Sequence, residues 1–179
     1  MTADADPREE LLAATDGLSD EQARTLLGWI RMMRREPATV AAEHSVGPLA
    51  DLLGIVSEER KPGRARMRLT VDPAWRNPNG VLHGGVIYIM IDYSMGGAIQ
   101  PNLPEGDYCT TIEVKVSYLS AVREGSLTVE TEVVKQGRNI AFTESKVTDD
   151  QGRLVATASG SMFIIRPDER SSGATSSAK

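Results

Sequence analysis

The pattern of hydrophobic and polar residues changes near Leu53. From there on, apolar and polar side chains alternate with a period of two, which is typical of strands buried on one face. This alternation predicts six strands, at Gly54–Glu59, Arg64–Val71, Thr110–Leu119, Ser126–Lys135, Ile140–Asp149 and Arg153–Ile164. Short segments that carry glycine separate the last four, as short antiparallel connections require. We therefore expect an antiparallel sheet with one buried face.

The stretch His83–Gln100 breaks the alternation. Its β-branched residues alone would favour a strand. The apolar stretch, however, continues past Asp92 to Ile99 and reaches a total length of about 15 residues or more, which is long for a strand. The pairs Asn79-Gly80 and Gly84-Gly85 supply a turn and a flexible start, as a helix N-terminus needs when a ligand approaches its amides. Because a helix that is apolar on nearly every side must be surrounded by protein, we predict an α+β fold. In this fold the antiparallel sheet wraps around one central helix.

The two ends of the chain differ from its middle. An extra N-terminal helix is predicted over Leu18–Glu36, because Ser19 and Gln22 suit a capping box and Pro37 ends the apolar stripe. Residues 169–179 are small and polar, which is typical of a disordered tail. These patterns predict an N-terminal helical extension over residues 1–48, a folded domain over 49–167 and a tail over 168–179.

Composition narrows the class of protein. The hydrophobic share of 40% together with 16 glycines in 179 residues is enough for a core and excludes a wholly disordered chain. The longest apolar run, Val86–Ile91, is far too short to cross a bilayer, and the acidic N-terminus lacks the pattern of a secretory signal. A net charge of -5 argues against nonspecific binding to nucleic acid. Cys109 is the single cysteine, and no Cys/His set has metal-ligand spacing. We expect a cytoplasmic protein with no metal and with neither nucleic-acid nor membrane partners.

Asp92 is the polar residue of the central helix that needs an explanation. Burying an unpaired carboxylate is costly, so Asp92 either lies in a wet, functional cavity or makes a structural hydrogen bond. At the helix start, the amides of Gly84 and Gly85 would suit a carbonyl oxygen that acquires negative charge. The alternative is that these glycines only allow a tight turn or close packing.

The spacing of these groups predicts an oligomer. Gly84 and Asp92 are eight residues apart, so on one helix they lie about 12 Å apart along the axis. One carbonyl group cannot contact both. If they act together, they must come from two antiparallel copies of the helix across a two-fold axis, which predicts a homodimer with two equivalent sites.

The stretch NPNGVLHGG at residues 77–85, followed by Asp92 nine positions after the histidine, resembles the hotdog-fold acyl-CoA thioesterases of the phenylacetate-pathway (PaaI-like) type. The segments VKVSYLS, VKQGR and LVATA, at residues 114–120, 134–138 and 154–158, are similar to the same family in order and spacing. The resemblance covers about residues 49–167 and leaves out the N-terminal helix. It implies a hotdog fold in which a sheet wraps one helix and the helices of two protomers pack side by side.

The resemblance also implies roles for individual residues. Asp92 matches the catalytic carboxylate, which acts either as general base on water or as nucleophile, and Gly84 matches the backbone donor that polarises the thioester oxygen. Asn77 matches a side-chain amide that positions water or the reacting group. His83 matches a histidine that organises the turn, and we expect a structural hydrogen bond there rather than base catalysis. Thr111 falls where family members often carry a hydroxyl that helps to hold water near the carboxylate.

For the substrate, an acyl-CoA, the resemblance implies contacts from Gly85 and from the turns at the ends of the sheet, with Lys135, Gly137 and Arg138, and also Arg123, near the coenzyme A phosphates. The alternative for the basic residues is that they are ordinary solvated loop charges. No cofactor is expected, because a thioester needs less activation than an amide and a placed carboxylate with an oxyanion donor suffices.

The resulting hypothesis is a homodimeric thioester hydrolase that converts an acyl- or aryl-CoA to free acid and coenzyme A. The sequence does not decide whether two such dimers associate into a tetramer. The main alternative is a noncatalytic hotdog protein that binds or senses acyl-CoA. A hydratase of the same fold is a further alternative, although no acidic residue stands near His83 in the sequence. The last is a purely structural dimeric module, in which Asp92 would be hydrogen-bonded and dry.

Overall fold

The computed structural model describes residues 6–20, 22–23, 26–27, 30 and 43–167. The chain forms two compact units, Met1–Glu36 and Pro37–Lys179. The predicted boundary between residues 48 and 49 stays a prediction, and the predicted tail over 168–179 lies outside the described residues. In the part of the chain that is described, no helix is long and apolar enough to span a membrane.

The N-terminal unit contains a helix that the sequence analysis missed, α1 (Pro7–Thr15), which has no buried residue. The capping box that follows it is confirmed. The backbone N–H of Ser19 donates to Gln22 Oε1 at 2.9 Å, and the N–H of Gln22 donates to Ser19 Oγ at 3.3 Å. Much of the helix predicted over Leu18–Glu36 lies outside the described residues, so its extent stays a prediction.

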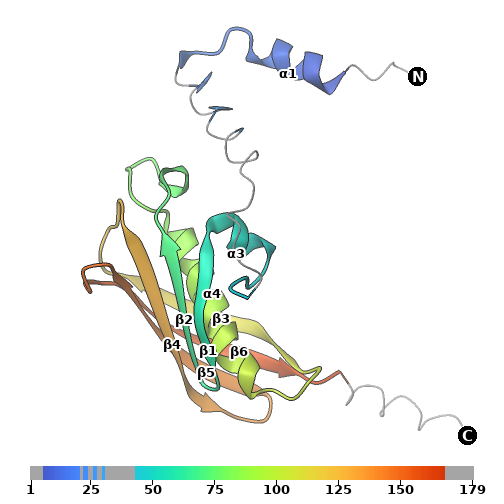
Figure 1. Cartoon of the computed structure of the whole chain (residues 1–179), viewed down its shortest axis with the longest axis vertical. Helices are drawn as coiled ribbons and strands as arrows, with labels where there is room; N and C mark the ends of the chain where they lie inside the picture. The colour runs from blue at the N-terminus through green and yellow to red at the C-terminus, as the bar shows by residue number, and fades with distance from the viewer. Residues whose placement is uncertain (1–5, 21, 24–25, 28–29, 31–42, 168–179) are drawn as a thin grey trace, which may run out of the picture. The chain divides into compact units, whose positions relative to one another are not determined.

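The second unit is built on one antiparallel sheet of six strands in the order β1-β2-β4-β5-β6-β3 (Figure 1). All six predicted strands are confirmed, with ends that differ by at most two residues. The strands are β1 (Ile55–Lys61), β2 (Arg64–Thr70), β3 (Tyr108–Tyr118), β4 (Ser126–Gln136), β5 (Ile140–Asp149) and β6 (Leu154–Ile165). Among the strands that the structure describes, β3 pairs with β6 alone, so β3 forms an open edge of the sheet.

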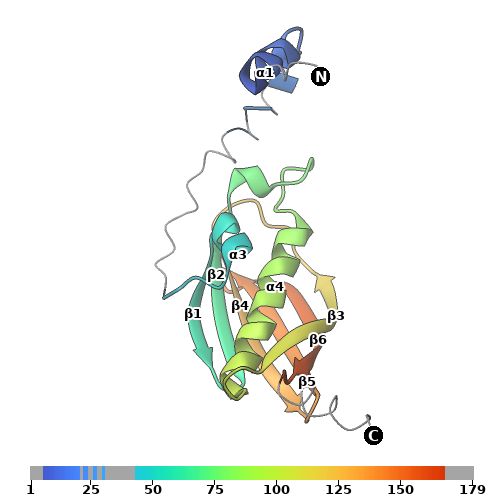
Figure 2. The same cartoon turned by 90° about the vertical axis from the view of Figure 1, so that its right-hand side faces the viewer.

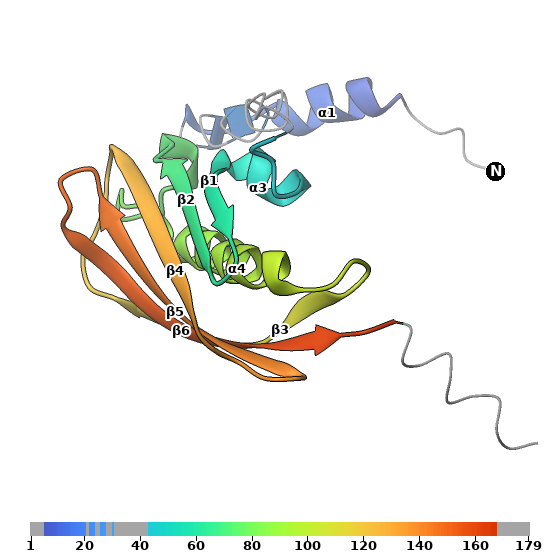
Figure 3. The same ribbon diagram turned by 60° about the horizontal axis from the view of Figure 1, so that its bottom comes forward.

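The central helix is also confirmed, as α4 (Gly84–Ile99). It lies across the face around which the sheet curves (Figures 2 and 3). Met90, Ile91 and Met95 are fully buried and share one core with the apolar residues of the strands. The prediction of a helix surrounded by protein is therefore correct.

Two short helices between residues 43 and 84 were not predicted, and neither was the 3-10 turn η2 (Gln100–Asn102) directly after α4. The helix α3 (Pro48–Leu53) begins with proline at its first position and ends at Gly54, whose φ of 76° is left-handed. Gly54 therefore ends a helix rather than beginning a strand, and β1 starts one residue later than predicted. The other is a 3-10 turn, η1 (Pro73–Trp75), which precedes the loop that leads to α4.

Three buried hydroxyl groups connect α4 to the sheet. Thr131 Oγ1 lies 2.8 Å from Ser94 Oγ on α4 and 2.7 Å from Ser145 Oγ on β5. The three side chains are almost fully buried, so each needs a hydrogen-bond partner and finds it in the others. This cluster fixes how α4 is rotated on the sheet, and thereby which residues of the helix face away from the core.

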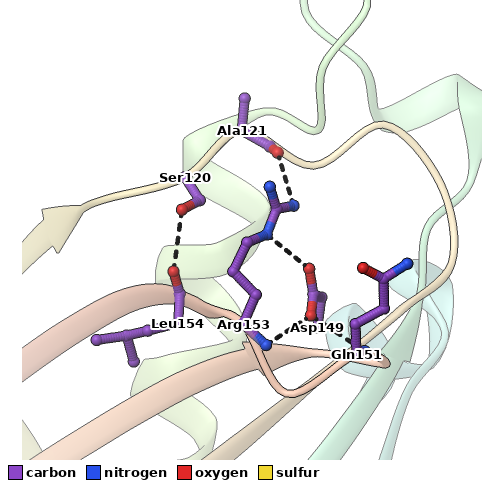
Figure 4. Close-up of polar contacts among 6 residues, drawn as sticks. All are labelled: Ser120, Ala121, Asp149, Gln151, Arg153 and Leu154. Atoms are coloured by element: carbon purple, nitrogen blue, oxygen red, sulfur yellow. Dashed lines mark hydrogen bonds and ion pairs between the residues drawn. The ribbon is translucent and has the colours of Figure 1, made fainter.

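The turn between β5 and β6 supports the loop that follows β3 (Figure 4). The Asp149 carboxylate accepts hydrogen bonds from the backbone amides of Gln151 and Arg153, at 3.1 and 2.9 Å, and from Arg153 Nε at 2.9 Å. Arg153 also donates to the carbonyl of Ala121 at 3.4 Å. Partial burial raises the pKa of Asp149, but the hydrogen bonds and the charge of Arg153 outweigh it and hold that pKa below its ordinary value.

We expect Asp149→Asn to lower the Tm at neutral pH and to have a smaller effect in acid. A carboxylate with a lowered pKa stabilises the folded state above its ordinary pKa of about 4, and this contribution is lost as the pH falls through the lowered value. Thermal unfolding followed by circular dichroism at about pH 7 and about pH 2.5 measures the difference. The control is Asp150→Asn, in the same turn. A Tm difference that is equal at both pH values would contradict the interpretation.

Candidate active site

The start of α4 presents one backbone amide for a ligand. His83 caps the helix, because its Nδ1 accepts a hydrogen bond from the Gly85 N–H at 2.9 Å, while the Val86 N–H donates to the His83 carbonyl at 3.0 Å. Among the residues that the structure describes, the Gly84 N–H has no acceptor. Since a helix N-terminus favours negative charge, this amide suits an oxygen that becomes an anion.

The capping hydrogen bond also defines the tautomer of a neutral His83 ring. Because Nδ1 accepts a hydrogen bond, a neutral ring carries its proton on Nε2. The imidazole therefore makes the local hydrogen bond that was expected of it. Its role as a structural residue rather than a base stays a prediction.

Asp92 lies on α4 and is partly exposed. Its Oδ1 accepts a hydrogen bond of 2.7 Å from Thr111 Oγ1 on the edge strand β3. A hydroxyl that donates to a carboxylate makes a strong, charge-assisted bond and orients it. The structure thus brings Asp92 and Thr111 together, and it leaves Gly84 about two turns before Asp92, at the start of the same helix.

A β-bulge in β3 is the reason why Thr111 reaches α4. Thr111 pairs with Met162 and Glu113 pairs with Ser161, so Ile112 is an extra residue in the strand. A bulge shifts the alternation of a strand by one position. As a result Thr111, before the bulge, and Tyr118, after it, point to the same face of the sheet although they are seven residues apart.

Asn77 organises the loop that leads to the helix start. Its Oδ1 accepts hydrogen bonds from the backbone amides of Asn79 and Val81, at 2.9 and 3.4 Å. The turn also requires Gly80, whose φ is 72°. Since the side-chain oxygen is engaged in the loop, the Nδ2 amino group is the part of Asn77 that can contact water or substrate.

Tyr118 is a residue of the site region to which the sequence analysis gave no role. Its hydroxyl donates to the Gly84 carbonyl at 2.9 Å. Burial, and to a smaller extent the neighbouring Tyr88, raises the pKa of Tyr118. The contact joins residues 34 positions apart, so no local pattern in the sequence could have shown it.

A pocket of about 300 Å³ opens beside Gly84. Besides Gly84 and Tyr118, it is lined mainly by apolar side chains, among them Val81, Leu82, Ile87, Leu119 and Val122. Its position next to the free amide and its apolar lining suit the acyl part of a ligand.

The predicted phosphate-contacting residues lie at the other end of α4. Asn102, just beyond the helix C-terminus, donates to Gln136 Oε1 at the end of β4, at 3.1 Å. Lys135, Gly137 and Arg138 surround Gln136 in the chain, and so they lie far from Gly84 within one protomer. Of the predicted substrate contacts, Gly85 alone is at the helix start, and its amide is already bonded to His83.

Cys109 is half-buried near this site. Burial raises the pKa of its thiol, and the charge of Asp92 adds to the effect. A thiol with a raised pKa is protonated at neutral pH and is a poor nucleophile. Among the described residues, no group of three or more His, Cys, Asp or Glu side chains is arranged to hold a metal ion.

Comparison with known proteins identifies the class. Residues 79–156 match the thioesterase superfamily. The chain is 32% identical to a candidate esterase of Saccharolobus solfataricus over 104 residues, which are 58% of this chain and 74% of the relative. It is 23% identical to the 1,4-dihydroxy-2-naphthoyl-CoA hydrolase of Listeria monocytogenes over 107 residues, 60% of this chain and 87% of that protein.

Solved structures show the same fold. A thioesterase of Haemophilus influenzae superposes with a TM-score of 0.64 at 23% identity, covering 67% of this chain and 84% of that one. The chain therefore belongs to the thioesterase superfamily, has the hotdog fold and is a thioester hydrolase.

We expect His83→Ala to lower the free energy of unfolding by about 1 kcal/mol, because the helix loses its cap. His83→Asn should restore most of this stability, since its side-chain oxygen can accept from the same amide, and should keep thioesterase activity within a few-fold. Chemical denaturation and a free-thiol assay measure the two effects. If His83 were the general base, His83→Asn would lose about 100-fold or more in rate.

Proposed function

We propose that this protein hydrolyses an acyl- or aryl-CoA thioester, in the manner of the PaaI-like type, at a site shared by two protomers. The observation that supports this most strongly is the arrangement of Gly84 and Asp92 on α4. They are eight residues apart with Tyr88 midway, so all three lie on one face of the helix. This face is partly exposed, and Tyr88 is 38% exposed.

Two copies of α4 that pack antiparallel would bring these groups together. A two-fold axis at residue 88 places Gly84 of one helix opposite Asp92 of the other, and it does so twice. The open edge of β3 lies on the same side of the protomer and exposes 54% of Ile112. An apolar, unpaired edge strand is a natural surface for pairing with a second chain.

The same arrangement accounts for the predicted substrate contacts. Lys135 and Arg138 lie at the C-terminal end of their own α4, and hence toward the Asp92 end rather than the Gly84 end. In the antiparallel pair they would approach the Gly84 of the partner. The acyl group would then enter the apolar pocket beside Gly84, and the coenzyme A phosphates would lie near basic residues contributed by the other protomer.

The chemistry follows from the groups that meet. The Gly84 N–H would donate to the thioester oxygen and stabilise the negative charge that develops there, which in comparable sites is worth about 3 kcal/mol. Asp92, oriented by Thr111, would either take a proton from water as it attacks the carbonyl or attack directly as a nucleophile. In the first route the carbon–sulfur bond then breaks, and the proton passes from Asp92 to the leaving thiolate. In the second route the thiolate leaves as the acyl–Asp92 anhydride forms and takes a proton from solvent, and water then hydrolyses the anhydride and regenerates the Asp92 carboxylate. Both routes yield free acid and coenzyme A.

We expect Asp92→Asn to reduce kcat by roughly 100-fold to 10,000-fold, the range typical of losing a general base. A panel of acyl- and aryl-CoA esters, with detection of the released thiol, measures activity in both proteins. Thr111→Val should give a smaller loss, because the carboxylate stays and only its orientation is relaxed. Binding of acyl-CoA without thiol release by the wild type would instead favour a noncatalytic binding protein, and unchanged turnover in Asp92→Asn would remove the mechanism.

We expect Tyr88→Cys, in a Cys109→Ser background, to cross-link into a covalent dimer on mild oxidation or with a short bismaleimide. The two-fold axis brings the two residues 88 within the separation of about 7 Å that a disulfide tolerates. Denaturing electrophoresis without reductant detects the product. Gln151→Cys, in an exposed turn, is the matched control and should stay monomeric on the gel. A non-cross-linking Tyr88→Cys protein that is active and monomeric in solution would rule out the shared site.

A further inference from the structure

The first peptide of α4 is held on both of its sides. The peptide unit that joins Gly84 to Gly85 has its carbonyl bonded to the Tyr118 hydroxyl at 2.9 Å and its N–H bonded to His83 Nδ1 at 2.9 Å. Two consecutive glycines have wide conformational freedom, and the first turn of a helix lacks half of its backbone hydrogen bonds. The His83 contact satisfies one of the N–H groups that lack a partner in the helix, and the Tyr118 contact restrains the carbonyl. Together they restrict a segment that its two glycines would leave free to move.

The ring of Tyr118 adds a second constraint. A Cβ atom at position 84 would lie 3.2 Å from Tyr118 Cζ and 3.3 Å from Cε1. The ring therefore packs directly on the glycine and occupies the space that a side chain would take. The backbone of Gly84 is helical and has no positive φ that would favour glycine, so the reason why glycine suits this position is the tight contact that a side chain would make with the Tyr118 ring.

We propose that Tyr118 is a positioning residue for the reaction, which holds Gly84 so that its free N–H points at the thioester oxygen. This inference rests on the proposed function of the Gly84 amide. The hydroxyl holds the Gly84–Gly85 peptide through its carbonyl, and the ring packs against the Cα of Gly84. Together they restrict rotation about φ and ψ of Gly84, the rotations that would turn the preceding peptide and its N–H away from the substrate. A preorganised donor of this kind stabilises the transition state without reorganising during the reaction.

Other groups around Tyr118 are consistent with this role. The strand β3 carries Thr111, which orients Asp92, and Tyr118, which orients Gly84. One edge strand therefore positions both reacting groups of its own protomer. Because the pKa of Tyr118 is raised, the hydroxyl stays protonated and remains a donor over the neutral range.

The test is Tyr118→Phe, which keeps the ring on Gly84 and removes only the hydroxyl. We expect kcat to fall about 10-fold, the factor that corresponds to one hydrogen bond, with KM unchanged and the Tm lowered by no more than the few degrees that the loss of one hydrogen bond costs. Tyr108→Phe is the matched control, since Tyr108 lies on the same strand, is similarly exposed, and has no hydrogen bond from its hydroxyl among the described residues. It should keep wild-type kinetics. A Tyr118→Phe protein with wild-type kcat would overturn the inference. An equal decrease of kcat in Tyr118→Phe and in the Tyr108→Phe control would also overturn it.

A second variant separates positioning from folding. A fluorinated tyrosine at position 118 keeps the size of the side chain but loses its proton at lower pH, and a phenolate cannot donate to the Gly84 carbonyl. We expect the alkaline limb of the kcat–pH profile to shift to lower pH, and an unshifted profile would overturn the proposal. If the wild type itself releases no thiol from any acyl-CoA, the proposed function fails. If the wild type is active and both variants behave like it, only the role of Tyr118 fails.

Discussion

The structure depends on the burial of a helix that is apolar on nearly every side. Nine of the sixteen residues of α4 are buried, and each large apolar side chain among them stabilises the fold by about 1.5–3 kcal/mol relative to exposure. Such a helix has no favourable position in water, so the sheet must curve around it. The hydroxyl cluster of Ser94, Thr131 and Ser145 then selects one rotation of the helix on the sheet, because any other rotation would leave buried hydroxyls without partners.

This constraint limits where chemistry can occur. Only a narrow stripe of α4 escapes burial, and Gly84, Tyr88 and Asp92 all lie on it. The helix N-terminus supplies an amide at one end of the stripe and the carboxylate lies two turns away. A rigid helix keeps these groups apart within one chain, and the symmetry of a pair of helices is the simplest way to join them. The separation that prevents a site in one protomer thus becomes the basis of the proposed site between two.

The candidate site could be predicted in part. Asp92 stands out because a carboxylate within an apolar helix needs either a solvated site or a hydrogen-bond partner. The glycines at residues 84 and 85 mark the start of the helix. Thr111 came from the family resemblance alone, and its bond to Asp92 is visible only in three dimensions. The helices α1 and α3 were missed because they are short and expose much of their surface, so they lack the long apolar periodicity on which helix prediction depends. For Gly84 the sequence offered ligand approach, a tight turn or close packing, and the structure shows close packing against the ring of Tyr118.

By itself, the sequence determined the six strands, the buried central helix and the wrapping of the sheet around that helix. These follow from the periods of two and 3.6 and from the total amount of apolar surface, which are local properties of the chain. The tertiary structure alone decided that Thr111 and Tyr118 face α4 together. Simple alternation puts residues seven apart on opposite faces of a strand, and the bulge at Ile112 reverses this. Such a bulge is a feature of the pairing between β3 and β6. It cannot be predicted from the sequence of either strand alone, because the pairing joins segments that are distant in the chain.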